Sequence, residues 1–308
     1  MARDLPVGND AGPDGPAPSL FVARGVQQTC PRHVKYRTRL RTPAMPLNVV
    51  VCLKQIPNPD LQFQIAPGGK DIRRDTLNYK LNASDEYALE EAVRLKEKHG
   101  GRAVALTLGP KRTEQMLREA LAKGADEAVR IAYEDVATYD VGKVGRLLAL
   151  AIRTMPHDLV LTGVQSDDLV NSATGGLIAG ILGLPHASVV TRVEVSDGRV
   201  EAASELEGGL QRVLNLPLPA LLTIQFGANT PRYAPLPAIM KAARQPIKEL
   251  GPPALGLPSW DIPLPYSFGV QGLSPPAAKG HAEMIGGSIE EQAKRLAQIL
   301  REKGFVRR

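Results

Sequence analysis

The chain has 308 residues, 43% of them hydrophobic and 23% charged, which is enough to bury a core in one large domain or two small ones. No apolar run approaches the ~18 residues that a membrane-spanning helix needs. The net charge of +6 is uneven, because residues 1–44 hold seven basic and three acidic residues and so carry +4 of it. The nearly neutral remainder, with a single tryptophan, offers no basis for binding nucleic acid.

Residues 1–44 are rich in Gly, Pro and Ala and then basic, with no helical or strand period, which predicts a disordered N-terminal extension. A targeting peptide is one interpretation, although three early aspartates argue against a mitochondrial transit peptide. We favour an upstream extension, because Met45 directly precedes the first strand and would make a natural initiator. Two cysteines, Cys30 and Cys52, cannot form a disulfide framework, and a reducing, cytoplasmic location of bacterial or archaeal type is expected.

From Met45 onward, strand-like and helix-like segments alternate. Apolar runs rich in β-branched residues predict strands at residues 47–54, 102–109, 127–132 and 158–163. Amphipathic or apolar patterns between them predict helices at residues 84–98, 111–123, 139–154 and 171–183. This alternation is typical of an α/β fold with an open, mostly parallel sheet and helices on both faces, a Rossmann-like architecture.

The pattern changes after Pro185. Alternating strands are predicted at residues 188–196, 199–207, 211–216 and 220–226, with turns at Asp197-Gly198 and Gly208-Gly209, as an antiparallel extension of the same domain. We therefore expect one α/β domain over residues 45–250. Residues 251–308 are predicted to be a Pro-rich arm that ends in a helix at 288–304, with Ser288 as cap and Glu291 in the capping-box position.

One loop is suited to an anion. No GxGxxG follows the first strand and no GxxxxGK[ST] occurs, which disfavours a nicotinamide Rossmann protein and a P-loop NTPase. After the strand at 158–163, a polar loop from Gln165 leads to Asn171-Ser172-Ala173-Thr174-Gly175 at the start of an apolar helix. Backbone N–H groups at a helix start suit a phosphate, and ligands of open α/β sheets bind beyond the carboxyl ends of strands. Simple capping of the helix by Asn171 or Ser172 is the alternative.

Four ordered segments resemble the beta subunit of electron-transfer flavoproteins. They are VVVCLKQIPNPD, LNASDEYALEEAVRLKEKHGG, LGPKRTEQMLREALAKGADEAVRI, and the pair ELEGGLQRVLNLPLPALLT and PRYAPLPAIMKAARQPI. The tail HAEMIGGSIEEQAKRL also resembles that of many bacterial members, so the resemblance covers residues 47–304. It implies an electron-carrier subunit without catalytic residues of its own, paired with an alpha subunit that holds FAD at the interface. Electrons would pass from flavin dehydrogenases of the acyl-CoA type toward a quinone-linked oxidoreductase.

The resemblance also assigns roles by position. It implies that the Rossmann-like α/β domain is an adenine-nucleotide-binding domain. The nucleotide in this subunit would be AMP, or a second FAD in electron-bifurcating relatives. The cofactor contacts it implies are Cys52, Lys54, Asn82, Leu108, Gly163, Gln165, Ser166, Asp168, Asn171, Ser172, Ala173, Thr174 and Gly175. Glu205 matches an acidic residue near the interface flavin. Leu236 matches the anchor for dehydrogenase docking, with Met240 and Lys241 beside it. The arm and its helix are expected to dock on the alpha subunit.

Several positions depart from the family pattern. AMP-binding members read Asn-Gln-Thr-Gly where this chain has Asn-Ser-Ala-Thr-Gly, and the Gln-Val-Gly-Pro run of bifurcating relatives is also missing. AMP is favoured over a second FAD. Functions of a different class are an adenylate-using enzyme and a nucleotide-sensing protein. An adenylate-using enzyme needs a Ser-Gly-Gly-rich loop after the first strand, where this chain has Lys54-Gln55-Ile56-Pro57. A nucleotide-sensing protein needs a glycine-rich phosphate loop, which this sequence lacks.

Overall fold

A computed structural model describes residues 46–58, 60, 63–74, 77–134, 140–261, 270–275, 282 and 284–306. The extension predicted at residues 1–44 and much of the predicted arm lie outside these residues. The described residues all fall in the unit that spans residues 42–308.

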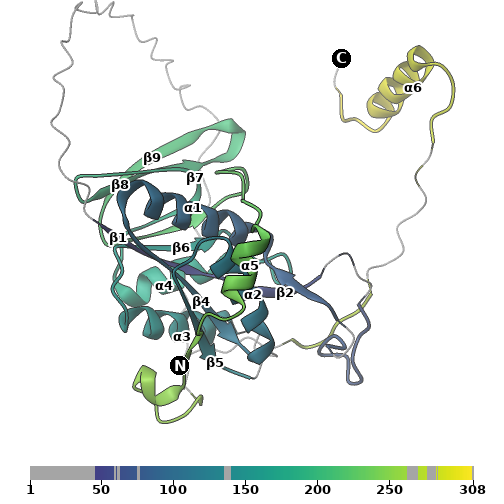
Figure 1. Cartoon of the computed structure of the whole chain (residues 1–308). Helices are drawn as coiled ribbons and strands as arrows, with labels where there is room; N and C mark the ends of the chain where they lie inside the picture. The colour runs from purple at the N-terminus through teal and green to yellow at the C-terminus, as the bar shows by residue number, and fades with distance from the viewer. Residues whose placement is uncertain are drawn as a thin grey trace, which may run out of the picture. The chain divides into compact units, whose positions relative to one another are not determined.

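A nine-stranded sheet forms the centre of the fold (Figure 1), with the strand order β11-β5-β4-β1-β6-β10-β7-β8-β9. The strands are β1 (Leu47–Cys52), β4 (Gly101–Gly109), β5 (Glu127–Ala132), β6 (Leu159–Gly163), β7 (His186–Ser196), β8 (Arg199–Glu205), β9 (Gln211–Pro217), β10 (Ala220–Ile224) and β11 (Lys248–Leu250). The run from β11 to β7 is parallel, and β7, β8 and β9 form an antiparallel meander. The predicted fold class, a mostly parallel sheet with an antiparallel extension, is confirmed.

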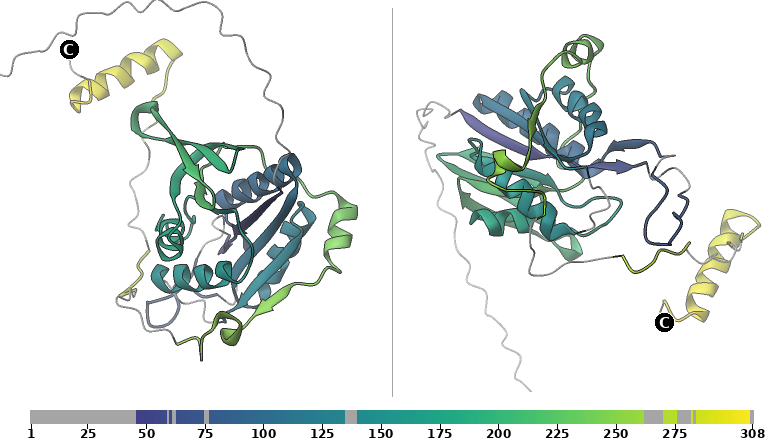
Figure 2. Two further views of the ribbon diagram at one scale, coloured as in Figure 1. Left: turned by 90° about the vertical axis from the view of Figure 1, so that its left-hand side faces the viewer. Right: turned by 90° about the horizontal axis from the view of Figure 1, so that it is seen from below.

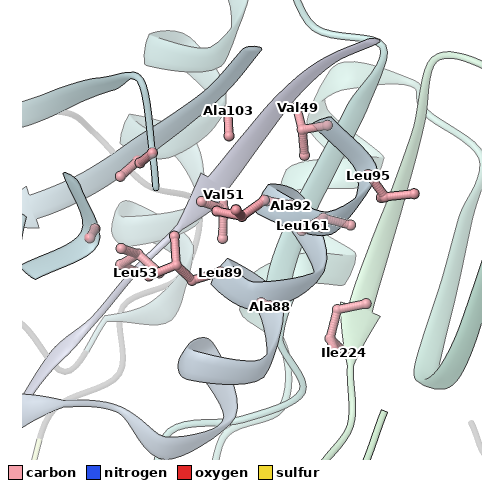
Figure 3. Close-up of a cluster of buried hydrophobic side chains, with 14 of the residues drawn as sticks. Val49, Val51, Leu53, Ala88, Leu89, Ala92, Leu95, Ala103, Leu161 and Ile224 are labelled. Atoms are coloured by element: carbon pink, nitrogen blue, oxygen red, sulfur yellow. The ribbon is translucent and has the colours of Figure 1, made fainter. Parts of the chain in front are cut away.

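Helices cover both faces of the parallel sheet, as the two views of Figure 2 show. On one face, α1 (Ala83–His99) and α2 (Glu114–Ala122) pack on the strands, and on the other face α3 (Val141–Arg153) and α4 (Thr174–Leu182) do so. Alternate residues of β1 divide between the two cores, because side chains along a strand point to opposite faces. Figure 3 shows Val49, Val51 and Leu53 beside α1, whereas Val50 and Cys52 join the core under α3 and α4.

The chain reverses its direction of winding at β1. From β1 it runs outward through α1 to β4 and through α2 to β5, and then returns through α3 to β6 on the other side of β1. The loops that leave β1 and β6 therefore diverge to opposite faces of the sheet. Such a switch point leaves a crevice beyond the carboxyl ends of the two strands, which is where open α/β sheets bind ligands.

The strand predicted at residues 220–226 differs most from expectation. The sequence pattern placed it among alternating antiparallel strands, but β10 lies parallel between β6 and β7. Its residues Ala220 to Ile224 are all buried, so the apolar run ALLTI reads as a strand covered on both faces. Strands β7, β8 and β9 form the predicted extension, and Asp197 and Gly198 make the predicted turn with positive φ angles of 50° and 71°.

Several short elements carried too little pattern to be predicted. They are the hairpin of β2 (Gln55–Pro57) and β3 (Tyr79–Leu81), the edge strand β11, the helix α5 (Leu236–Ala242), and the 3-10 turn η3 (Pro252–Leu255). The 3-10 turn η1 (Lys111–Thr113) begins the helix predicted at residues 111–123, and the 3-10 turn η2 (Glu207–Gly209) falls at the turn predicted at Gly208-Gly209. The helix predicted at residues 288–304 forms as α6 (Ile289–Glu302). Its capping box is present, since Ser288 Oγ accepts from the N–H of Glu291 and Glu291 Oε2 accepts from the N–H of Ser288.

Candidate functional site

A cavity of about 180 Å³ lies at the switch point, beyond the carboxyl ends of β1, β4 and β6. Twelve of the thirteen residues predicted to contact a cofactor line it. They are Cys52, Lys54, Asn82, Leu108, Gly163, Gln165, Ser166, Asp168, Asn171, Ser172, Ala173 and Thr174. They come from segments that are more than 100 residues apart in the sequence. The fold therefore brings into one concave site the residues that the family resemblance grouped together.

The loop after β6 is tied to the start of α1. The backbone carbonyl of Gln165 accepts hydrogen bonds from Asn82 Nδ2 at 2.9 Å and from Ser84 Oγ at 2.6 Å, and Asn82 Oδ1 accepts from the N–H of Asp167 at 3.0 Å. Val170 and Ser172 in this loop have left-handed φ angles of 53° and 50°. Non-glycine residues adopt such angles at an energetic cost, and they cluster at binding sites whose surroundings enforce the shape.

The helix predicted at residues 171–183 begins later, at Thr174. Neither Asn171 nor Ser172 caps it, because the N-cap residue is Ala173 and no side chain accepts a hydrogen bond from the first turn. Within the part of the chain that the structure describes, no side chain therefore accepts from the first N–H groups of α4 at the edge of the cavity. A helix start of this kind carries a partial positive charge and suits a phosphate or another anion.

Asp85, at the start of α1, links the two sides of the crevice. Its Oδ2 accepts from the N–H of Lys54, just beyond β1, at 2.7 Å, and its Oδ1 accepts from the N–H of Gly163, at the end of β6, at 3.0 Å. Burial raises the pKa of Asp85 to about 7, although hydrogen bonds from Lys54, Asn82 and Gly163 partly oppose this shift. An added methyl group at Gly163 would collide with Ser84 and Asp85, which explains the glycine there.

Three cationic side chains line the cavity, those of Lys54, Arg74 and Arg112. Lys54 Nζ contacts Asp168 Oδ1 at 2.5 Å and Ser166 Oγ at 3.0 Å, so it lies against the loop that precedes α4. The sequence pattern did not single out Arg74, Arg112 or Tyr79, which also line the cavity. The guanidinium of Arg112 lies 4.1 Å from the centre of the Tyr79 ring. Only the folded chain could reveal these residues, because Tyr79 lies on β3, Arg74 lies between β2 and β3, and Arg112 lies on η1.

Two of the predicted cofactor residues have a packing role. Gly175, the thirteenth, does not line the cavity, and an added methyl group there would collide with Thr223 on β10. It lets the first turn of α4 approach the sheet. Cys52 lines the cavity and also belongs to the core under α3 and α4. Burial raises the pKa of its thiol far above the usual value, so the side chain stays neutral.

The remaining predicted residues lie outside the cavity. Glu205 is exposed at the end of β8, opposite Gln211 of β9. Leu236, Met240 and Lys241 lie on α5, where the side chains of Leu236 and Met240 are 69% and 60% exposed. Exposed apolar side chains on one short helix are suited to contact another protein.

The family is decided by comparison with known proteins. The model of the electron transfer flavoprotein domain matches residues 71–255. The chain is 38% identical to the electron transfer flavoprotein subunit beta of Methylophilus methylotrophus over 261 residues, which is 83% of this chain and 98% of that protein. The chain belongs to the electron transfer flavoprotein beta-subunit family. The family resemblance read from the sequence is thereby confirmed.

Other members of the family match over the same length. The electron transfer flavoprotein subunit beta of Bacillus subtilis is 34% identical, covering 84% of this chain and 100% of the relative. The caffeyl-CoA reductase-Etf complex subunit CarD of Acetobacterium woodii is 33% identical with the same coverage. Members of this family act as subunits of electron carriers associated with flavin. Among the described residues, no helix is long and apolar enough to cross a membrane.

Proposed function

We propose that this beta subunit holds AMP in the cavity at the switch point while its alpha partner holds the FAD that carries electrons. The observation that supports this most directly is the convergence of twelve predicted contact residues on one cavity beside an uncapped helix start. The N–H groups of α4 would bind the phosphate, and the ends of β1 and β4 would enclose the adenosine. The nucleotide takes no electrons and stabilises the divergent loops.

We further propose that electrons pass from flavin dehydrogenases of the acyl-CoA type through the heterodimer to a quinone-linked oxidoreductase. α5 supports this, because Leu236 and Met240 offer a small apolar anchor beside the cation of Lys241. Transient complexes bind through a few such residues and bury little surface. Glu205 would lie at the interface flavin, and the arm that ends in α6 would dock on the alpha subunit. The compartment proposed is the cytoplasm.

Co-expression with an electron transfer flavoprotein alpha subunit from the same source tests the proposal. The purified protein is expected to be a heterodimer whose FAD is reduced when an acyl-CoA dehydrogenase and butyryl-CoA are added. Absorbance at the flavin band follows the reduction. If no heterodimer forms, or if the FAD stays oxidised with active dehydrogenase present, the proposed electron-carrier role is wrong.

A second redox-active FAD in this subunit is the alternative function. The cavity supports it in one respect, because Arg74 and Arg112 also line it and their cations could hold a second phosphate. The absence of the Gln-Val-Gly-Pro run favours AMP. Counting flavin separates the two functions: one FAD for each heterodimer supports AMP, and two support electron bifurcation.

A further inference from the structure

The docking helix α5 has little burial to hold it in place. Of its seven residues, Leu236 to Ala242, only Ala242 is buried. A two-turn helix is not stable by itself in water, because forming its first turn costs more than its few hydrogen bonds return. Its position over α2 (Figure 1) must therefore be fixed by side chains from outside the helix.

Arg232, four residues before α5, makes the most extensive of these contacts. Its Nε donates to Glu90 Oε2 at 2.8 Å, and its Nη1 and Nη2 donate to the two carboxylate oxygens of Glu97 at 2.7 Å and 3.0 Å. The N–H of Arg232 also donates to Glu90 Oε2, at 3.2 Å. Two carboxylates about two turns apart on α1 therefore hold one guanidinium, with the forked geometry that makes such pairs strong.

The α1 side of this contact is itself well supported. The side chain of Glu90 is only 4% exposed, and Arg94 Nε donates to its other oxygen at 2.7 Å. Burial opposes ionisation of Glu90, but hydrogen bonds from Arg232 and Arg94 outweigh it and lower its pKa. Nearby, Asn229 Nδ2 donates to the carbonyl of Tyr87 at 3.0 Å and to Glu91 Oε2 at 2.9 Å. The chain entering α5 is thus tied to α1 at two successive points.

Arg118 of α2 holds the other end of α5. Its Nη1 lies within hydrogen-bond distance of the carbonyls of Ala242, Ala243 and Gln245, at 3.0 Å, 2.9 Å and 3.2 Å. These carbonyls lie at and just beyond the last turn of the helix, where the backbone carries a partial negative charge that a cation stabilises.

We propose that Arg232 and Arg118 are positioning residues for partner docking, and that together they keep α5 ordered before a dehydrogenase arrives. The inference rests on the proposed docking role of Leu236. A pre-ordered helix presents Leu236 and Met240 without an entropic cost at the moment of binding. Loss of either arginine weakens docking while leaving the electron-transfer step within the complex unchanged.

Steady-state reduction of the heterodimer by an acyl-CoA dehydrogenase with butyryl-CoA provides the test. Arg232→Gln and Arg118→Gln are each expected to raise the KM for the heterodimer by about tenfold, with kcat and nucleotide content unchanged. Arg232→Lys keeps the positive charge but loses the forked guanidinium, so its KM should lie between those of the wild type and Arg232→Gln. Arg102→Gln is the matched control, since Arg102 pairs with Glu127 at 2.6 Å at the far end of β4 and should leave KM unaltered.

Hydrogen exchange at the amides of α5 is the second readout, and it needs no dehydrogenase. The amides of Ile239 and Ala243, which bond within the segment, should exchange at least about tenfold faster in Arg232→Gln than in the wild type. Wild-type exchange in Arg232→Gln and Arg118→Gln would overturn the inference whatever the KM. Leu236→Ala separates the two proposals. A raised KM in Leu236→Ala with a wild-type KM in both arginine variants would contradict only the positioning role of the arginines. An unchanged KM in Leu236→Ala would contradict the docking role of α5 itself.

Discussion

Asp85 links the two sides of the candidate site, although its sequence context suggests only a helix start. An acid in the first turn of a helix is ordinary, because it complements the helix dipole. In the structure the carboxylate instead bridges backbone N–H groups of Lys54 and Gly163. It holds together the two strands whose loops diverge around the cavity. Sequence spacing could not indicate this, because its bonding partners lie 31 and 78 residues away.

The pH dependence of stability reports on Asp85. Its pKa is about 7 in the folded chain, above its usual value near 4, so the folded state binds an extra proton between these pH values. The raised pKa of Asp85 therefore stabilises the folded state fully below about pH 4, and this stabilisation is lost as the pH rises to about 7. Asp85→Asn cannot titrate, and urea unfolding should show a flatter dependence over this range in the variant.

The same variant has a second consequence. The NH2 group of the asparagine amide would face one of the two backbone N–H groups, and two donors cannot bond to each other. The Asp85→Asn variant should therefore also have a free energy of unfolding about 1–3 kcal/mol lower at pH 7. Parallel pH profiles for wild type and variant, offset by a constant, would mean that Asp85 does not titrate in this range.

At the scale of elements, close approach of α4 to the sheet positions the helix start beside the cavity. The sequence predicted a helix here and the family resemblance assigned Gly175 to the cofactor, but neither could say which glycine is needed for packing. Gly175 touches β10 through Thr223, whereas an added methyl group at Gly176 meets no atom within 4 Å. The two adjacent positions therefore form a natural matched pair.

Gly175→Ala should destabilise the chain by about 1–3 kcal/mol, because the methyl group forces α4 away from β6 and β10. Gly176→Ala should leave stability unchanged or raise it by about 0.4–1 kcal/mol, since alanine lowers the entropy of the unfolded chain. Thermal unfolding of the two variants measures the difference. Equal stabilities would show that α4 tolerates a shift and that its approach to the sheet is not fixed by Gly175.

Pattern strength explains which elements the sequence predicted. Long segments with clear periods, such as α1 and β4, were predicted within a few residues of their ends. Three-residue strands and the seven-residue α5 carry too few residues to show a period. Strand β10 was assigned to the wrong neighbours because a strand pattern gives burial but not pairing, and its partners β6 and β7 are fixed only by tertiary packing.

At the scale of the whole molecule, the order of alternating elements predicted the parallel sheet, and the switch point follows from the reversal of winding at β1. The family resemblance, not the general pattern, supplied most of the residues that line the cavity. The long-range ties at Asp85 and Arg232 could not be predicted, because single charged residues carry no signal of their partners before the chain is folded. These ties connect the two proposed surfaces through one helix, α1.

Analysis of the nucleotides released from the purified heterodimer tests the central claim most directly. After denaturation, chromatography with mass detection should find one AMP and one FAD for each heterodimer. The variant Gly163→Ala should lose the AMP and keep the FAD, because the added methyl group collides with Ser84 and Asp85 and displaces the end of β6 beside the cavity. A wild-type heterodimer that releases one FAD and no other adenine nucleotide would contradict the account.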